Sequence, residues 1–494
     1  MAFSVNFPLF SIVLCLLCAV VSSLLPSKAA RAVSIALCAA LAAGAACLAS
    51  YGVSVGKATE YLMGHYPHPW GNELRFGVLE PLLVSVFAVV MLLCLIGGKR
   101  YLAADLDPKK SNLYYVMCDL VLVSLTALSY TNDLFTGYVF IEICTIASCG
   151  ILMIRQLGRT TLASVRYMIF SLIGSGLFLL GLILLYAVTG HLLMPNVKES
   201  VAALWAEGRY RTVLLMSMAL ITVGLGVKSG LFPFHFWMPD TYGYATPSSG
   251  GILSGLVSKG YILLLIRIVY GAFGTDIFYR SGISNVLFVF GACGVIVGSI
   301  SAAREKDVSR MVAYSSAAQI GYIYLGIGLS PGMGVLASLF HILTHALTKP
   351  LLFLSAAELA SCAGSRQRAV WRGAGHINRV AGFAFSVGAF SMIGIPLTMG
   401  FVSKYRFALA AFERPLLMIP TLIVLAVSTV LNGLYFIRVV VAIYLPPERR
   451  TDRVRITDHP AYAVCAIAFT AMNLAAGIAA LPIVRLLESS LTLL

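Results

Sequence analysis

Residues 221–240 read ITVGLGVKSGLFPFHFWMPD, an apolar run that contains Lys228 and Pro233. A run of about twenty apolar residues is long enough to cross the ~30 Å hydrocarbon core of a bilayer. A lysine at that depth is costly, so its presence indicates a function by default. Proline removes a backbone hydrogen bond, and Pro233 therefore predicts a helix break beside Lys228. We expect a transmembrane helix that is interrupted next to a buried charge.

Similar apolar runs recur along the whole chain of 494 residues, of which 59% are hydrophobic and 11% charged. The mean hydropathy is +0.91. Soluble domains carry about 25% charged residues, so the composition excludes a soluble protein. Only helices and closed barrels satisfy the backbone in lipid, and the runs lack the alternating pattern of barrel strands. We predict an all-α, polytopic membrane protein of about fourteen transmembrane helices, with the first helix retained because no basic signal-peptide segment precedes it.

The predicted spans are residues 7–25, 31–50, 78–98, 113–131, 134–154, 165–189, 211–236, 248–271, 284–303, 308–328, 333–359, 380–404, 417–444 and 460–484. Loops after odd-numbered spans hold twenty Lys and Arg residues, whereas the opposite loops hold eight. Basic residues collect in cytoplasmic loops, so this asymmetry predicts that both termini lie outside a bacterial or archaeal cell membrane. It also explains the net charge of +15 without nucleic acid as a partner.

Other charged or titratable residues lie within the apolar runs. Glu142 lies in GYVFIEICTIASCG, and Lys259 lies in GILSGLVSKGYILLLIR. Lys259 has apolar or small neighbours on both sides in the sequence. Its side chain is therefore not expected to reach the membrane–water interface. Snorkelling to the interface explains Arg267 and Arg438 adequately. We expect Glu358 to be interfacial, and Asp119 to be either a pairing partner or an interfacial residue.

The run FHILTHALTKPLLFL places His341, His345 and Lys349 at successive four-residue spacing, on one face of one helix. Two histidines at this spacing can bind zinc. The run lacks an H-E-x-x-H pattern and a third ligand, and Lys349 would repel a cation. We therefore favour a proton relay over a metal site and expect neither metal nor cofactor in this chain.

A second broken helix is predicted at GIPLTMGFVSK, where Pro396 precedes Lys404. The two Pro-plus-Lys helices are five spans apart, which is the spacing of an inverted pair of five-helix repeats. We expect four regions along the chain. They are residues 1–112 (helices 1–3), 113–271 (first repeat), 284–444 (second repeat) and 445–494 (the last loop and helix).

The residue types suggest how such an axis could work. Desolvation disfavours a buried ammonium group, whereas a nearby carboxylate favours it. Lys228 paired with Glu142 would hold its proton, and separation of the pair would release it. Histidines can pass protons near neutral pH. A series of Glu, Lys, Lys, His and Lys therefore predicts a switchable proton wire.

At these residues the sequence resembles the antiporter-like membrane subunits of respiratory complex I, Mrp-type sodium/proton antiporters and membrane-bound hydrogenases. The resemblance covers more than 300 residues and rests on YVFIE, KSGLFPFHFWMPDTY, LVSKGYILLLIR, RMVAYSSAAQIGY, HILTHALTKPLLF and GIPLTMGFVSK. It implies fourteen helices, two inverted repeats, partner membrane subunits and movement of H+ or Na+ along a buried axis. By position in these motifs it implies translocation roles for Glu142, Lys228, Lys259, His341, His345, Lys349 and Lys404.

Three functions remain open from the sequence: a cation-pumping subunit driven by redox chemistry in its partners, a D-type antiporter subunit without a redox partner, and a structural subunit. The segment REKDVSRMVAYSS departs from the family's Q-x-D-x-K-R form at Glu305 and Ser309. This departure favours an Mrp- or hydrogenase-like complex over an N-type complex I subunit. No Rossmann, P-loop or iron–sulfur pattern indicates a catalytic site in this chain, although its parent complex could be a quinone reductase or a hydrogenase.

Overall fold

The computed structural model describes residues 2–66, 71–446 and 454–493, most of them helical. The helices up to residue 280 are α1 (Ala2–Leu24), α2 (Ser27–Val55), η1 (Met63–His65), α3 (Leu79–Gly97), α4 (Lys99–Asp105), α5 (Ser111–Tyr130), α6 (Leu134–Met153), α7 (Gly158–Thr189), α8 (Met194–Ala206), α9 (Arg211–Ser229), η2 (Phe234–Trp237), α10 (Met238–Tyr244), α11 (Pro247–Ile252), η3 (Leu253–Val257), α12 (Ser258–Ile268), η4 (Val269–Phe273) and α13 (Thr275–Arg280).

The remaining helices are α14 (Ile283–Arg304), α15 (Val308–Leu329), α16 (Met333–Ala363), η5 (Arg368–Val370), α17 (Ala374–Ile377), α18 (Arg379–Ile393), α19 (Met399–Ala411), α20 (Pro415–Tyr444), α21 (Pro460–Ile478) and α22 (Ala480–Leu491). Strands β1 (Thr59–Leu62) and β2 (Glu73–Phe76) form an antiparallel hairpin. Among the helical turns, η3 and η4 are π-helical.

Side chains fix where several helices begin. The Asp133 carboxylate accepts a hydrogen bond from the backbone N–H of Thr136 at 2.6 Å, which caps α6. Asp307 and Asn378 cap the first turns of α15 and α18 in the same way. Such caps satisfy backbone donors that have no partner within the helix.

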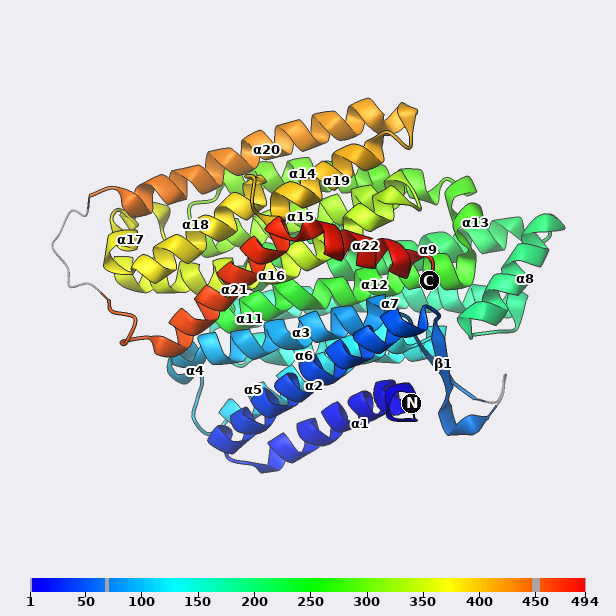
Figure 1. The fold of residues 1–494 in the computed structure, drawn as a ribbon, viewed down its shortest axis with the longest axis horizontal. Helices are drawn as coiled ribbons and strands as arrows, with labels where there is room; N and C mark the ends of the chain where they lie inside the picture. Colours follow the sequence, from blue (N-terminus) through cyan, green and yellow to red (C-terminus); the bar gives the residue numbers. More distant parts are fainter. Residues whose placement is uncertain (1, 67–70, 447–453, 494) are drawn as a thin grey trace.

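Twelve segments of the described chain are long and apolar enough to cross a membrane. α15, and α18 together with α19, complete the fourteen segments that the sequence predicted. The predicted polytopic all-α fold is therefore confirmed. The segments run roughly alongside one another, and both termini lie towards the end of the bundle that carries α8, α13 and the hairpin (Figure 1).

Three predicted spans are each divided into separate helices. The span predicted at 211–236 extends to Tyr244 and consists of α9, η2 and α10. The span predicted at 380–404 is α18 and α19, and the one at 460–484 is α21 and α22. The first two divisions match the predicted proline breaks. The third lies at Ala479, whose φ of −93° and ψ of 39° are not helical. Pro482 in the first turn of α22 cannot donate a backbone hydrogen bond to the Ile478 carbonyl, and this break was not predicted from the sequence. The hairpin and α8 were not predicted.

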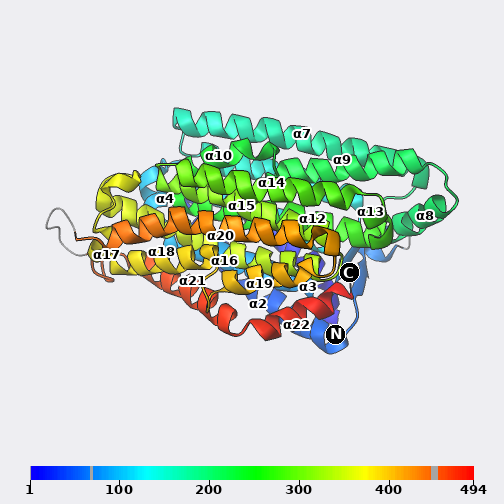
Figure 2. The same cartoon turned by 90° about the horizontal axis from the view of Figure 1, so that it is seen from above.

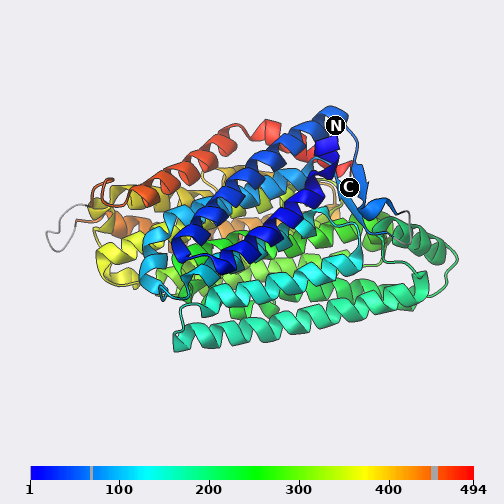
Figure 3. The same cartoon turned by 90° about the horizontal axis from the view of Figure 1, so that it is seen from below.

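Two segments occupy the centre of the bundle. The α11–α12 segment (Pro247–Phe273) and α16 are entirely buried by other helices over their most apolar stretches. α7 and α9 lie side by side at one edge in the view from above (Figure 2). In the view from below, α1 and α2 cover another face (Figure 3). The central pair carries four of the seven predicted translocation residues, namely Lys259, His341, His345 and Lys349.

Candidate ion-translocation axis

The first interruption lies between α9 and α10. α9 ends at Ser229, and Gly230 has a φ of 81°, a left-handed conformation that glycine adopts without steric cost. Pro233 lies in the non-helical segment that comes next. Lys228 is therefore in the last turn of α9, where a cation is favoured by the helix dipole. The sequence placed both the break and the lysine at these positions.

Lys228 forms an ion pair with Glu142 of α6. Its Nζ lies 3.3 Å from Glu142 Oε1 and donates a hydrogen bond to Thr145 Oγ1 at 2.6 Å. The Nζ also lies 5.6 Å from the centre of the Tyr261 ring. The Lys228 side chain is fully buried, whereas 24% of the Glu142 side chain is exposed. The lysine is thus paired with a carboxylate that lies at the edge of the bundle.

A glycine contact positions Lys228. A methyl group built on Gly174 of α7 would lie 2.8 Å from the Gly224 carbonyl oxygen and 2.8 Å from Lys228 Cγ. A methyl group on Gly224 would in turn lie 2.5 Å from the Gly174 carbonyl oxygen. The backbones of α7 and α9 can therefore approach this closely only because both residues are glycine.

Lys259 lies directly beyond the π-helical turn η3. Its Nζ donates to the backbone carbonyl oxygen of Ser254 and, at 3.1 Å, to Ser258 Oγ. Gly255 lies against α16, since a methyl group there would be 2.9 Å from Pro350 Cγ. Lys259 is fully buried, and neutral oxygens hold its ammonium group.

The three residues on α16 are buried but are held differently. His341 Nδ1 lies 2.7 Å from Ser403 Oγ of α19. Neither ring nitrogen of His345 has a hydrogen-bond partner within the described residues. Lys349 Nζ donates to the Val312 carbonyl oxygen at 3.0 Å and to Ser315 Oγ, both on α15. The two ring nitrogens of the buried His345 imidazole are therefore not engaged by protein groups among the described residues.

The second interruption holds Lys404. α18 ends at Ile393, Gly394 has a φ of 92°, and α19 begins at Met399, so Pro396 lies in the gap. Lys404 Nζ donates to the Ile393 carbonyl oxygen at 2.7 Å and to Thr429 Oγ1 at 3.0 Å. The lysine thus satisfies an end carbonyl of α18.

Asn432 satisfies the carbonyl that Pro396 leaves free. Proline removes the hydrogen bond to the carbonyl four residues before it, which here is Met392. Asn432 Nδ2 of α20 donates to that oxygen at 3.2 Å, and Asn432 Oδ1 accepts from Tyr435 at 2.6 Å. Nothing in the sequence distinguished Asn432 from other polar residues in apolar helices.

Aromatic rings link parts of the series. The Lys404 Nζ lies 5.8 Å from the centre of the Tyr322 ring, and that ring is 5.5 Å from the His341 ring. The His341 and His345 rings are 6.3 Å apart. The structure brings Glu142 and Lys228 into direct contact, whereas the other predicted residues meet hydroxyl groups, carbonyl oxygens and rings.

The profile of the NADH:quinone oxidoreductase/Mrp antiporter transmembrane family matches residues 131–431. The chain belongs to this family. The matched range begins in the loop that leads into α6 and ends within α20, so it includes both interrupted helices. The family resemblance stated from the motifs is confirmed.

Known proteins from both branches of the family are similar to the chain. The N-type subunit of the NADH-quinone oxidoreductase of Desulforudis audaxviator is 33% identical over 422 residues, 84% of this chain and 82% of that protein. The D-type subunit of the Na(+)/H(+) antiporter of Bacillus subtilis is 27% identical and covers 79% of this chain and 77% of that protein. A chain of the Mrp complex from Dietzia sp. DQ12-45-1b has the same fold, with a TM-score of 0.88 at 23% identity over 100% of this chain and 97% of that one.

The departure from the family pattern at Glu305 has a structural explanation. Arg310 at the start of α15 forms ion pairs with Glu305 at 3.1 Å and with Asp240 of α10 at 3.2 Å. Asp240 also pairs with Arg166 of α7 at 2.9 Å. Glu305 thus supplies a second carboxylate to Arg310. Through its pair with Asp240, Arg310 links α10, the second half of the first interrupted helix, to α15.

Three charged residues differ from, or refine, the expectations for them. Arg267 does not snorkel: it is buried, and its guanidinium donates to the Ser129 carbonyl oxygen. Glu358 lies near the end of α16 but is only 1% exposed. Asp119, left open by the sequence, is buried and accepts hydrogen bonds from Ser34 at 2.9 Å and Ser22 at 3.1 Å. These partners are distant in the sequence, and no local pattern indicated them.

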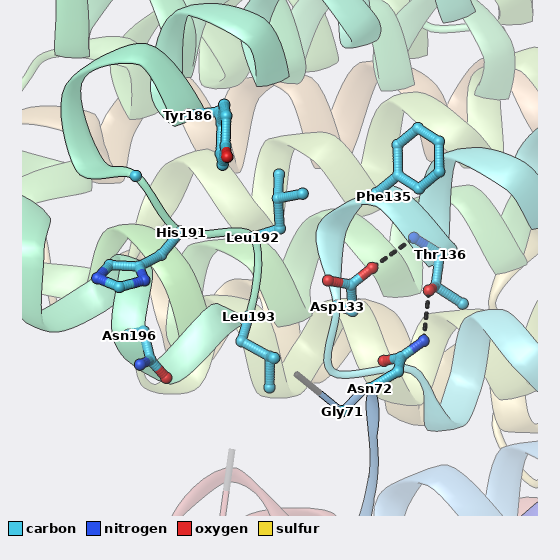
Figure 4. Close-up of a pocket in the computed structure, with 11 residues that line it drawn as sticks. Gly71, Asn72, Asp133, Phe135, Thr136, Tyr186, His191, Leu192, Leu193 and Asn196 are labelled. Carbon is cyan, nitrogen blue, oxygen red and sulfur yellow. Dashed lines mark hydrogen bonds between the residues drawn. The ribbon is translucent and has the colours of Figure 1, made fainter. Parts of the chain in front are cut away.

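A cavity of about 380 Å3 lies at the end of the bundle where α6 begins (Figure 4). Asp133, Thr136, His191 and Asn196 contribute polar groups to its wall, and Asn72 donates to Thr136 Oγ1 at 2.6 Å. None of the seven predicted translocation residues lines it. Asp133 is already engaged as the cap of α6.

Proposed function

We propose that this chain is a cation-translocating membrane subunit of a multi-subunit complex, and that it moves protons or Na+ along the buried axis from Glu142 to Lys404. The observation that carries the proposal is the Glu142–Lys228 pair at the interruption of α9. A charge pair at membrane depth is costly to keep, and a broken helix beside it supplies free backbone groups to a polar path. The relatives are named as N-type and D-type subunits of larger assemblies, which supports association with other membrane subunits.

The geometry supports a role for the pair as a switch. Glu142 stabilises the charged form of Lys228, and separation of the pair would favour release of the proton from a fully buried amine. Lys259, His341, His345 and Lys349 lie on the two central segments, between the two interruptions. We propose that they carry the proton onward to Lys404 through hydroxyl groups and water.

Two features of the arrangement rest on the sequence patterns and remain part of the proposal. The charge asymmetry of the loops supports an orientation with both termini outside. The matching interruptions, each with a buried lysine at the end of a half-helix, support the division into repeats at 113–271 and 284–444. In this arrangement the Glu142 end belongs to the first repeat and the Lys404 end to the second.

A D-type antiporter subunit is the second candidate, and the similarity to the D-type subunit of Bacillus subtilis favours it. The two candidates share the same axis and differ in what drives it. A redox-driven complex would translocate cations when its electron donor is oxidised, whereas an antiporter would exchange Na+ for H+ without electron transfer. The subunits that purify with the chain, identified by mass spectrometry, distinguish them.

The test of the switch is a double-mutant cycle of Glu142→Gln and Lys228→Ala. Each change leaves one member of the pair without its partner, and we expect each to abolish most cation flux. The double variant should lose little more than either single variant, because the residues act as one unit. Flux is measured in inverted vesicles that contain the whole complex, at matched abundance in the membrane.

Asp276→Asn provides the control, because it removes an exposed ion pair with Arg280 and such pairs contribute little to stability. We expect flux close to that of the unaltered chain. Near-normal flux in both Glu142→Gln and Lys228→Ala would overturn the proposed switch and leave a structural role for the subunit.

A further inference from the structure

A buried carboxylate, Glu358, lies near the end of α16 opposite to His341, within a cluster of polar side chains. Glu358 Oε2 lies 2.9 Å from His459 Nδ1 and 3.8 Å from the Arg100 guanidinium. Arg100 also contacts the His459 ring at 2.6 Å. Asn378 Nδ2 lies 3.5 Å from the same carboxylate oxygen. Glu358 is thus a carboxylate with almost no solvent exposure that is contacted from three other segments of the chain.

The cluster connects the buried carboxylate to water. The His459 side chain is 20% exposed and that of Arg100 is 52% exposed, whereas Glu358 is 1% exposed. Glu358 Oε1 accepts no hydrogen bond within the described residues. A histidine between solvent and a buried carboxylate with a free oxygen has the arrangement of a proton shuttle.

The polar contacts continue inward between α16 and α21. The Tyr462 hydroxyl donates to Ser355 Oγ at 3.0 Å, and Asn473 Nδ2 donates to Thr348 Oγ1 at 2.7 Å. Asn473 Oδ1 is buried and has no partner within the described residues. We name Glu358, His459, Ser355, Tyr462, Thr348 and Asn473 the α16–α21 seam. Its inner end, Thr348, is the residue before Lys349.

We infer that Glu358 and His459 admit protons from the α4–α17 end of the bundle to Lys349 through the α16–α21 seam. The inference rests on the proposed function and adds an entry route that the axis itself does not contain. A proton passes from bulk water to the His459 imidazole, then to the Glu358 carboxylate, and then through hydroxyl groups and water to the Lys349 amine. No bond other than the bonds to the transferred proton changes.

The spacing requires water in the inner part of the seam. Glu358 and Lys349 are nine residues apart, about 14 Å along the helix axis. Ser355 and Thr348 are seven residues apart, so one water molecule cannot join them. The unpartnered Glu358 Oε1 and Asn473 Oδ1 are the two groups that such water would contact.

The titratable and charged groups that face Glu358 come from all the elements packed against it. α4 contributes Arg100 and Tyr101, the segment before α21 contributes His459, α21 contributes Tyr462, and α16 itself contributes Cys362. Burial, and next the negative charge of Glu358, raise the pKa of the Tyr101 phenol. Tyr101 therefore stays neutral beside Glu358.

The test compares His459→Ala and Glu358→Gln in inverted vesicles that contain the whole complex. We expect proton flux to fall at least fivefold in each at matched abundance. Imidazole in the medium should restore at least half of the flux in His459→Ala, relative to the unaltered chain in the same imidazole. It should not restore flux in Glu358→Gln. A purely structural contact would show no such rescue.

Asp105→Asn is the matched control, since it removes an ion pair with Arg155 at the same end of the bundle whose two side chains are not part of the seam. It should keep near-normal flux. Glu142→Gln, measured in the same preparations, separates the two proposals. If Glu142→Gln loses flux while His459→Ala and Glu358→Gln keep it, the proposed proton entry through the seam is refuted and the proposed translocation axis is retained. Loss of flux in His459→Ala without rescue by imidazole would also refute the proposal that His459 passes protons into the seam.

Discussion

Gly174→Ala tests the close approach of α7 and α9 that positions Lys228. The added methyl group would lie 2.8 Å from the Gly224 carbonyl oxygen, 2.8 Å from Lys228 Cγ and 3.3 Å from the Lys228 backbone nitrogen. Two of these three atoms belong to the backbone, so a side-chain rotation cannot relieve the contact. α9 must move away from α7, and Lys228 must move with it.

Gly176 on the same helix offers the matched comparison, because a methyl group there meets no atom within 4 Å. Both changes gain the helix propensity of alanine over glycine, about 1 kcal/mol. This gain cancels between the two variants. The difference that remains is the loss of stability from overpacking at Gly174, about 1–3 kcal/mol. We therefore expect Gly174→Ala to be less stable than Gly176→Ala by about 2 kcal/mol, close to a thirtyfold change in an equilibrium constant.

The assay is thermal unfolding of the detergent-solubilised complex, followed by the loss of its monodisperse peak in size-exclusion chromatography. Cation flux in vesicles is measured in parallel. Gly176→Ala should keep the flux of the unaltered chain and unfold at a slightly higher temperature. Gly174→Ala should unfold at a lower temperature than Gly176→Ala and lose flux. Equal unfolding temperatures and equal flux in the two variants would show that the glycine contact does not position Lys228.

The remaining predictions concern orientation and the relay. A reporter that is active only outside the cytoplasm should be active when fused after Leu494 and inactive within the 446–456 loop; the reverse pattern would refute the orientation with both termini outside. His345→Gln keeps the size and hydrogen-bonding capacity of the side chain but cannot titrate near neutral pH. It should assemble normally and lose most flux in the vesicle assay, and unchanged flux would reduce His345 to a packing residue.

Features that depend on length, hydropathy or proline could be predicted from the sequence. A span of about twenty apolar residues needs no partner to be recognised, and Pro233 and Pro396 interrupt helices through a covalent property of their own. The pairing of Glu142 with Lys228 could also be predicted, because both residues lie in family motifs and a buried charge needs a partner of opposite charge. For the spans and the proline breaks the cause lies within one segment, whereas the Glu142–Lys228 pair was predicted from the family motifs.

Other features depend on neighbours that are remote in the sequence. Glu358 looks like an ordinary interfacial acid until His459 and Arg100, 101 and 258 residues away, are brought beside it. Asn432 became notable only when the structure placed it on the Met392 carbonyl. Periodicity within one helix carries no information about such contacts.

The complete enclosure of α16 has a consequence for the synthesis of the protein. α16 carries Lys349 and two histidines, and in the folded chain it is surrounded by protein along its most apolar stretch. A lysine at mid-membrane costs roughly 3 kcal/mol on insertion scales, so α16 is a poor candidate to enter lipid alone. Residues 330–332 join it to α15, which packs along it. We therefore expect the two helices to enter the bilayer as a hairpin, with the earlier segments that pack on α16, such as α3 and α11, already present beside it.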